Sequence, residues 1–489
     1  AGMAGFCLTG DIFDLFVWFE LMGVSAYALT AYRPEERGPL QGALNFAITN
    51  SVGAYLSLSG IAVIYGRTGA LNMAQIGRDI AGLRPDGLVI VAFLLIITGL
   101  LIKGAIVPFH FWLPDAHAVA PTPVCVLFSG VMVELGLYGV ARVYWSMFGQ
   151  ALGHRTVITA VFLTLGLLTA VVGALFCFRE RHLKRLLAFS TISHAGMFLA
   201  GISLLTPLGL AGTAVYVIGH ALLKAALFLC TGIVLHRLGS VNETALHGAG
   251  RRLRVTGVVF GLAAFGLAEL PPFAAYLGKG WIEDSAAARG LVWITIAFVA
   301  CSVLVGGALL RVAGGVFLGL GDPPAEDPQM AAEASEETSE TNRAKRRTPL
   351  SMIAPAALLV ALAGAVGLLP GFGTSVERAA IRFEDAGAYN AVVLSGGQAG
   401  HLVTPLAAEP AVVSSASLIT GAGTAAGAVV LALIALYWRR LPWLRRASLP
   451  GATSALAVRR LQSGVINDYV TWIVVGIACV GGVLAVTLR

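Results

Sequence analysis

About twelve long apolar runs divide the chain, and this pattern restricts its possible folds more than any other feature. A helix needs roughly 20 apolar residues to cross the hydrocarbon core of a bilayer. Because lipid offers no hydrogen-bond partners to an open backbone, runs of this length are expected to be α-helices. The sequence therefore predicts an all-α polytopic membrane protein with about 12 transmembrane helices. The runs lie near 11–32, 41–65, 87–109, 122–148, 157–178, 186–205, 208–236, 255–277, 291–318, 350–370, 412–438 and 468–488.

The small share of charged residues supports this interpretation. Only 12% of the 489 residues are charged, against about 25% in soluble domains. The formal net charge of +7 indicates cytoplasmic loops rich in Lys and Arg rather than a nucleic-acid surface. Basic clusters at 179–185, 251–254 and 439–460 fall on one side if the spans alternate. We expect a multi-pass protein of the bacterial plasma membrane, in contact with the lipid bilayer and with no nucleic-acid partner.

Changes in composition along the chain predict three segments. Residues 1–320 form a transmembrane core with ion-translocating residues, and 350–489 supply C-terminal transmembrane helices. The intervening 321–349 are rich in Pro, Glu and Ser, which predicts a flexible cytoplasmic linker. Charges within 371–411 predict a short surface helix. Residues 1–9 resemble the tail of an apolar span, so we expect that an N-terminal part is absent.

Two apolar runs are broken by proline, and both carry ionisable residues. In the first, Lys103 precedes Pro108; in the second, Glu269 and Lys279 flank Pro271 and Pro272. Proline interrupts a helix and frees backbone groups that only protein or water can satisfy inside a membrane. Ionisable residues within spans are costly, so they indicate functional positions. These two broken helices, in two similar units, are consistent with inverted repeats.

Lys224 lies deepest of the ionisable residues. It is roughly 18 Å of helix from His236, too far to reach the membrane surface. His220 lies one turn earlier on the same face. Buried Lys and His readily titrate in the physiological range, which favours a proton relay, although a satisfied structural pair would also explain them.

Lys103 and Glu20 form a second candidate pair. A nearby carboxylate would favour the charged lysine, so separating the two could load or release one proton. The alternatives are a Lys103 that extends to the cytoplasmic surface and a Glu20 that hydrogen-bonds to a neighbouring helix. Glu134 is a third candidate, unless it is protonated and inert.

Two further positions have strong structural alternatives. Lys279 could be an interfacial lysine, with Trp281 beside it in an aromatic belt. His194 follows a basic turn, and a single histidine on an apolar face is commonly structural.

Five stretches resemble the antiporter-like membrane subunits of respiratory complex I, multi-subunit Na+/H+ antiporters and membrane-bound hydrogenases. Together they are specific and cover most of residues 1–320. They are TGDIFDLFVWFELM, LIKGAIVPFHFWLPDAHAVAPTP, LKRLLAFSTISHAG, HALLKAALFLCTG and LAELPPFAAYLGK.

The resemblance implies a role for each matched position. Glu20 and Lys103 would form the glutamate–lysine pair of the input half-channel. His220 and Lys224 would lie on a central hydrated axis, and Lys279 would be the exit residue. Glu134 stands where the family commonly has a lysine, which makes cation binding plausible. Secondary candidates are His110, His194 and Glu269.

The sequence thus predicts a proton-translocating membrane subunit of a multi-subunit complex, as in complex I or an Mrp-type antiporter. Its partners would be other membrane subunits, H+ and, as an alternative, Na+. The chain would bind no cofactor, and any redox chemistry would belong to partners. Other interpretations are an independent secondary solute transporter and a structural membrane scaffold.

Overall fold

The computed structural model describes residues 1–82, 86–153, 155–322, 348–369, 371–395, 414–440 and 466–487. These residues form helices and two isolated β-bridges, and none of them belongs to a strand. Ten helices are long and apolar enough to cross a membrane, and two shorter apolar helices accompany them. Each of the twelve predicted runs contains one of these helices, so the all-α polytopic fold is confirmed.

The long spans are α2 (Ile12–Thr30), α3 (Arg37–Thr68), α10 (Arg155–Arg179), α11 (Leu183–Ser203), α12 (Pro207–Leu238), α15 (Trp293–Val312), α17 (Leu350–Leu368), α20 (Ser415–Tyr437) and α23 (Ile466–Thr487). One further span combines α7 (Thr122–Leu127), η1 (Phe128–Met132), α8 (Val133–Val143), η2 (Tyr144–Phe148) and α9 (Gly149–Leu152). The broken spans are α5 (Gly87–Lys103) with α6 (Trp112–Val119), and α13 (Arg254–Leu267) with α14 (Ala274–Ala288). Short elements are α1 (Gly2–Leu8), α4 (Met73–Ile80), η3 (Ala249–Arg252), η4 (Ala313–Leu318), α18 (Phe372–Glu384), α19 (Ala386–Leu394) and η6 (Trp438–Arg440).

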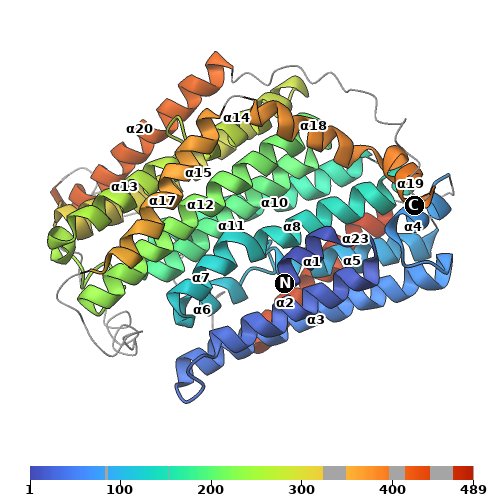
Figure 1. Cartoon of the computed structure of the whole chain (residues 1–489), viewed down its shortest axis with the longest axis horizontal. Helices are drawn as coiled ribbons and strands as arrows, with labels where there is room; N and C mark the ends of the chain where they lie inside the picture. The colour runs from blue at the N-terminus through green and yellow to red at the C-terminus, as the bar shows by residue number, and fades with distance from the viewer. Residues whose placement is uncertain are drawn as a thin grey trace.

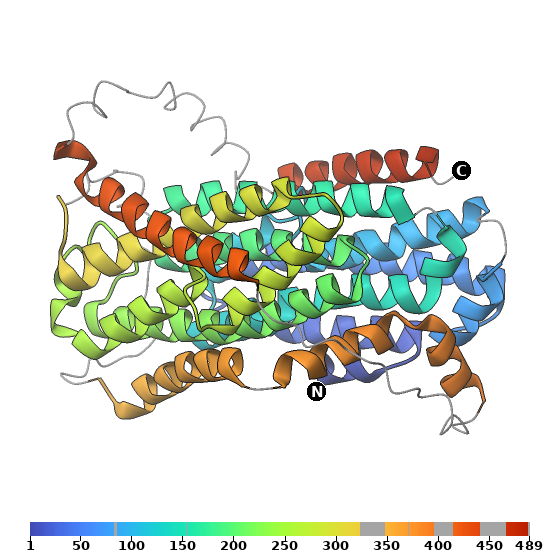
Figure 2. The same cartoon turned by 90° about the horizontal axis from the view of Figure 1, so that it is seen from above.

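The helices run side by side along one direction, with α11 and α12 in the middle of the bundle (Figure 1). The apolar window of α11 is buried along its whole length, whereas that of α17 is only 17% buried. Figure 2 shows α17 on one face of the bundle and α20 and α23 on the opposite face. The C-terminal helices therefore cover the outside, and the ionisable residues lie on the inner ones.

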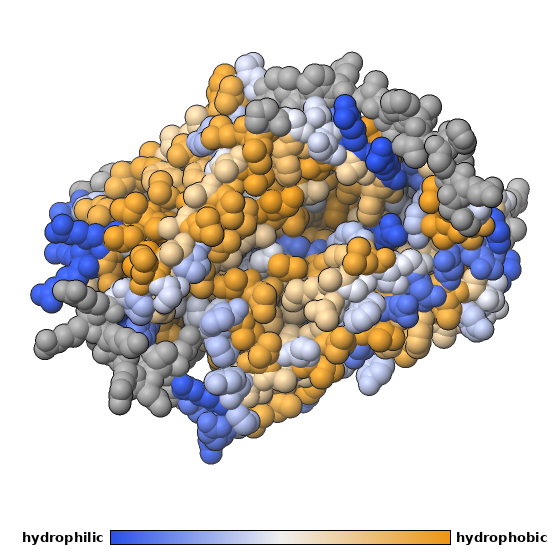
Figure 3. Space-filling model, viewed as in Figure 1, coloured by the Kyte–Doolittle hydropathy of each residue, from blue (hydrophilic) through white to orange (hydrophobic). Residues whose placement is uncertain are grey.

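The surface fits a membrane environment. Apolar residues cover the middle of the visible face, and hydrophilic residues gather toward its ends (Figure 3). Many large apolar side chains on the flanks are exposed, among them Val24 and Leu44. In water such a surface would be unfavourable, but lipid accepts it. The surface helix predicted in 371–411 corresponds to α18 and α19, while most of the predicted linker at 321–349 lies outside the described residues.

The two broken spans share one backbone arrangement. Ala105 and Glu269 each adopt a positive φ, and each stands three residues before a cis-proline. The Ile106 amide donates to the Leu101 carbonyl across the first break, and the Leu270 amide donates to the Phe265 carbonyl across the second. The corresponding residues of the two turns therefore make corresponding hydrogen bonds.

A second pair of features repeats at opposite ends of the bundle. Asp11, the N-cap of α2, forms an isolated bridge with Asn72, which follows α3. His182, the N-cap of α11, forms the same bridge with Asn242, which follows α12. An odd number of spans separates α2 from α11, so the two units have opposite directions. The structure therefore contains inverted repeats, as predicted.

Candidate functional site

Eight of the nine residues predicted from the sequence are buried inside the bundle. The exposed fractions of Lys103, His110, Glu134, His194, His220, Lys224, Glu269 and Lys279 range from 0% to 6%. Glu20 is half-buried. In the part of the chain that the structure describes, no three His, Cys, Asp or Glu side chains are grouped to hold a metal ion. The buried groups instead form three clusters along the bundle.

Lys103 and Glu20 form the first cluster, where α5 ends beside α2. The Lys103 Nζ atom lies 4.9 Å from the centre of the Phe19 ring and 5.7 Å from that of Phe46. Glu20, the residue after Phe19, interacts electrostatically with Lys103. Because Lys103 is fully buried, the alternative that it extends to the surface is wrong.

Glu134, His220 and Lys224 form the central cluster. The Nδ1 atom of His220 lies 3.1 Å from Oε1 of Glu134. Lys224, one turn further along α12, donates a hydrogen bond of 2.8 Å to the Leu187 carbonyl. His194 of α11 adjoins His220, with ring centres 4.7 Å apart. The structure therefore brings the predicted Glu134, His194, His220 and Lys224 together.

Lys279 lies in a third cluster, between two carboxylates. Its Nζ atom donates to Glu269, and it lies 3.2 Å from Oε1 of Glu283 on the next turn of α14. Lys279 is 2% exposed and Trp281 is 1% exposed. The interfacial interpretation of both residues is wrong, because the second half of the broken span folds back into the protein rather than ending at the lipid headgroups.

Polarisable side chains connect the central cluster with Lys279. The rings of His194 and Tyr216 lie 5.7 Å apart. The hydroxyls of Tyr216 and Ser302 both contact the sulfur of Met197, at 3.9 and 4.0 Å, and Ser302 also donates to Glu269. A continuous line of polar groups thus runs from Lys224 to Lys279 through the protein interior.

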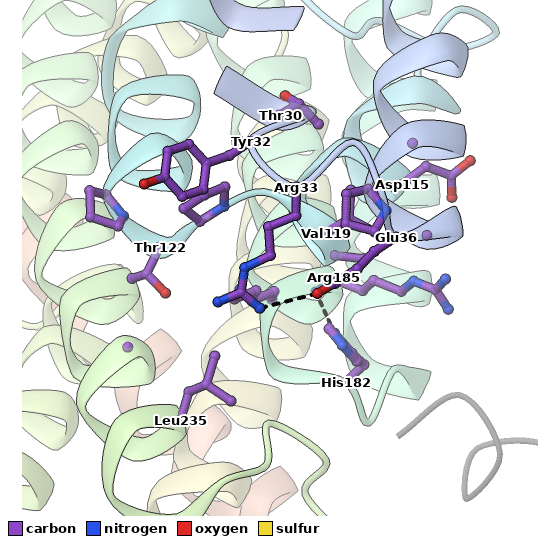
Figure 4. Close-up of a pocket in the computed structure, with 18 of the residues that line it drawn as sticks. Thr30, Tyr32, Arg33, Glu36, Asp115, Val119, Thr122, His182, Arg185 and Leu235 are labelled. Carbon is purple, nitrogen blue, oxygen red and sulfur yellow. Dashed lines mark hydrogen bonds and ion pairs between the residues drawn. The ribbon is translucent and has the colours of Figure 1, made fainter. Parts of the chain in front are cut away.

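A cavity of about 970 Å³ opens at one end of the bundle and approaches the central cluster. Figure 4 shows Arg33, Glu36, His182 and Arg185 around it, contributed by segments far apart in the sequence. These residues come from the loops that the charge pattern predicts to be cytoplasmic. Lys184 also lines the cavity and donates a hydrogen bond to the Ala120 carbonyl.

His117 lies between this cavity and Lys224. Its ring is fully buried, stacks on Phe228 with centres 4.9 Å apart, and interacts electrostatically with both Lys184 and Lys224. Neither ring nitrogen hydrogen-bonds to any residue that the structure describes. An unsatisfied buried imidazole beside a polar cavity is well placed to hydrogen-bond to water.

His110 is the candidate that the structure does not bring into the line. It lies at the first break with its ring 4.2 Å from that of Phe111. None of the contacts found for the described residues connects it with another candidate.

The sequence analysis missed His117, Tyr216 and Glu283. Glu283 had a usable signal, since it stands four residues after Lys279 on the same helical face. His117 lay within the quoted motif but carried no spacing that distinguishes it from a core histidine. Tyr216 gave no signal, because its position depends on how α12 packs against α11.

Comparisons with known proteins agree with this geometry. Residues 9–305, more than half of the chain, match the family described as "NADH:quinone oxidoreductase/Mrp antiporter, TM". The chain is 29% identical over 375 residues to the D-type polypeptide of the Na(+)/H(+) antiporter of Bacillus subtilis (strain 168), covering 76% of this chain and 71% of that protein. It is 30% identical over 361 residues to NADH-quinone oxidoreductase subunit N of Desulforudis audaxviator (strain MP104C), covering 73% and 70%.

The solved structures give the same answer. A chain in the structure of the Mrp complex from Dietzia sp. DQ12-45-1b superimposes with a TM-score of 0.69 at 27% identity, covering 80% of this chain and 78% of that one. The match of sequence and fold extends across both broken spans and all three clusters. The chain therefore belongs to the family of transmembrane subunits shared by NADH:quinone oxidoreductases and Mrp antiporters.

Proposed function

We propose that this chain carries protons across the membrane as one subunit of a multi-subunit complex. The observation that carries the proposal is the line of buried ionisable groups from Lys103 and Glu134 through Lys224 to Lys279. Buried ionisable groups are expensive in a membrane protein, and a chain of them across successive helices is typical of proton relays. The relatives named above are subunits of larger assemblies by name, which supports partners in the same membrane.

Each cluster has a distinct part in the proposed path. Glu20 and Lys103 form the input pair, whose separation changes the proton affinity of the lysine. The cavity and His117 supply water access from the predicted cytoplasmic side to Lys224. Lys279 is the exit residue. Any redox chemistry in the assembly belongs to other subunits, and this chain carries no cofactor.

The bacterial plasma membrane is the proposed location, because the relatives cited are bacterial proteins and the chain is a multi-pass membrane protein. Na+ is a candidate counter-ion on the strength of the match to an Na(+)/H(+) antiporter polypeptide. Redox-driven pumping is the second candidate, supported by the match to a polypeptide of NADH-quinone oxidoreductase.

Proton movement in inverted vesicles tests the proposal. The full-length chain is expressed with the products of the neighbouring genes, and a fluorescent dye reports the interior pH. We expect Lys103→Ala and Lys224→Ala each to lower the initial rate of complex-dependent proton movement by about a hundredfold, the size of effect that loss of a positioned acid or base produces. Arg67→Ala, at an exposed ion pair with Asp86, is the matched control and retains activity.

The direction of the result separates the candidates. If both lysine variants assemble and move protons at the wild-type rate, the relay is wrong and a structural role is left. An acid interior set up by an electron donor other than NADH then distinguishes the energy sources. Collapse of the pH gradient by Na+ indicates antiport, and no response to Na+ indicates redox-driven pumping.

A further inference from the structure

Glu269, Lys279, Glu283 and Ser302 form the third cluster, here called the exit cluster. Glu269 lies in the break between α13 and α14, Lys279 and Glu283 lie on α14, and Ser302 lies on α15. Lys279 contacts both carboxylates, and the Ser302 hydroxyl donates to the Glu269 carboxylate that also accepts from Lys279. All of these contacts lie inside the bundle.

The charges of the exit cluster do not balance. The side chains of Glu269, Lys279 and Glu283 are 1%, 3% and 6% exposed. When all three are ionised, two carboxylates face one ammonium, and the net charge is −1. The polar or titratable groups that surround the cluster add no resident positive charge of their own; they are His194, Tyr216, Tyr276, Asp284 and Cys301. Asp284 is held apart by hydrogen bonds from Ser414 and Ser417.

One Glu283 oxygen is under-used. Its Oε1 atom lies within ion-pair distance of Lys279 but makes no hydrogen bond with any residue in the described ranges. A buried carboxylate oxygen without a hydrogen bond, in a cluster with an uncompensated negative charge, is costly in a low-dielectric interior. Either a proton on a carboxylate or a small bound cation would remove both deficits.

The break in the helix gives the exit cluster the character of a cation site. Glu269 adopts a φ of +68°, a conformation that side chains other than glycine rarely adopt. The equivalent residue of the first break is Ala105, which carries no carboxylate. Carboxylate and hydroxyl oxygens suit hard cations, and interrupted helices near the middle of a membrane are where transporters coordinate Na+.

We propose that the exit cluster is an exchange site that holds either one proton or one Na+. In the first state a proton sits on one carboxylate, and the cluster is neutral. Na+ then binds between the Glu269 and Glu283 oxygens, the proton leaves to water, and the cluster remains neutral with Lys279 charged throughout. The exchange conserves charge and needs no other reactant. It deepens the proposed function, since it assigns a counter-ion to the exit end of the path.

Proton release at equilibrium tests this site without transport. The purified complex, in weakly buffered detergent solution with a pH-sensitive dye, receives NaCl, and matched additions of KCl and choline chloride correct for ionic strength. We expect Na+ to release about one proton per chain, as ion binding to protonated ligands does. Glu283→Gln and Glu269→Gln each abolish the release. Asp284→Asn, which removes a neighbouring carboxylate outside the exit cluster, leaves it intact.

Lys279→Met gives a result that a structural role would not. Removing the ammonium leaves two carboxylates without a resident cation, so Na+ should bind more tightly, by about tenfold or more, because a nearby like charge shifts ion affinity by one to three pK units. A purely structural lysine would instead weaken every Na+ response when it is lost. Size-exclusion chromatography of each variant shows whether it assembles.

Several outcomes overturn the proposal. It is wrong if Na+ releases no more protons than KCl from the wild-type complex at any pH where it is folded. It is also wrong if an assembled Glu283→Gln variant releases as many protons as the wild type, or if Lys279→Met weakens Na+ binding. Lys224→Ala separates this proposal from the proton path. It should lose transport and keep the Na+-induced release, so failure of one leaves the other standing.

Discussion

Arg311 and Glu243 illustrate how single residues fix the predicted cytoplasmic end. Arg311 is 1% exposed, and two of its nitrogens contact the Glu243 carboxylate at 2.9 and 3.0 Å. Its remaining donors reach the carbonyls of Phe178 and Glu180, while Arg181 adds a second ion pair to Glu243 at 3.0 Å. The end of α15 is thereby attached to the loops that follow α10 and α12.

Breaking this pair should destabilise the protein. Arg311→Met leaves Glu243 buried with only the partly exposed Arg181, and removing one partner of a buried ion pair costs about 3–5 kcal/mol. We expect a lower midpoint in a thermal scan of the detergent-solubilised complex, followed by size-exclusion chromatography. Arg311→Met combined with Glu243→Met should recover most of the loss. Equal destabilisation by the single and double variants would contradict the assigned role.

Individual ionisable residues were predictable where they interrupt an apolar run. Lys103 and Lys224 could be predicted because a lysine inside such a run is costly and has no bland explanation. Their partners could not be assigned with the same certainty. Whether Lys279 lies at an interface or between two carboxylates depends on where α14 folds, and the sequence interpretation left both open.

At the scale of elements, α10 and α11 pack backbone to backbone. A Cβ atom on Gly196 of α11 would overlap the Ala170 nitrogen and the Gly166 carbonyl of α10. Gly173 of α10 likewise approaches the backbone of Ser193. Small residues at helix crossings permit such contact in membrane proteins. The close packing holds His194 beside His220 in the central line.

This packing makes a matched pair of glycine substitutions informative. Gly196→Ala forces α10 and α11 apart, and overpacking of this kind costs about 1–3 kcal/mol. Gly261→Ala, in the middle of α13, places its methyl group where no atom lies within 4 Å. We expect Gly196→Ala to lower the thermal midpoint of the complex and its proton-transport rate, while Gly261→Ala matches the wild type. Equal effects of both substitutions would show that the glycine contact is unimportant.

The elements themselves followed from run length and from proline. All twelve spans were predicted, and both breaks were located by their prolines. The repetition of hydrogen bonds between the two breaks was not predictable, because the two turns share little sequence beyond proline and the following phenylalanine.

At the scale of the whole molecule, the three clusters lie in two repeats of opposite direction. Lys103 lies in the first repeat, whereas Lys224 and Lys279 lie in the second. A proton that enters beside one cluster and leaves beside another must cross the boundary between them. The proposed path is therefore serial rather than two parallel channels.

A serial path has a signature in double substitutions. If Lys103 and Lys224 act in one path, Lys103→Ala combined with Lys224→Ala should be no slower than the slower single variant, because residues that act as a unit are not additive. The initial rate of dye quenching in vesicles measures this. Independent channels would instead give partial loss in each single variant and a summed loss in the double one.

The sequence by itself determined the spans, the two breaks, the resemblance to a family and the buried lysines. Each of these depends on local properties: the length of apolar runs, the geometry of proline and the cost of charge in lipid. Only the tertiary structure decided which ionisable residues meet. Glu283 faces Lys279, His117 lies between a cavity and Lys224, and His110 stands outside the line, because contacts between distant helices are set by packing that no local pattern records.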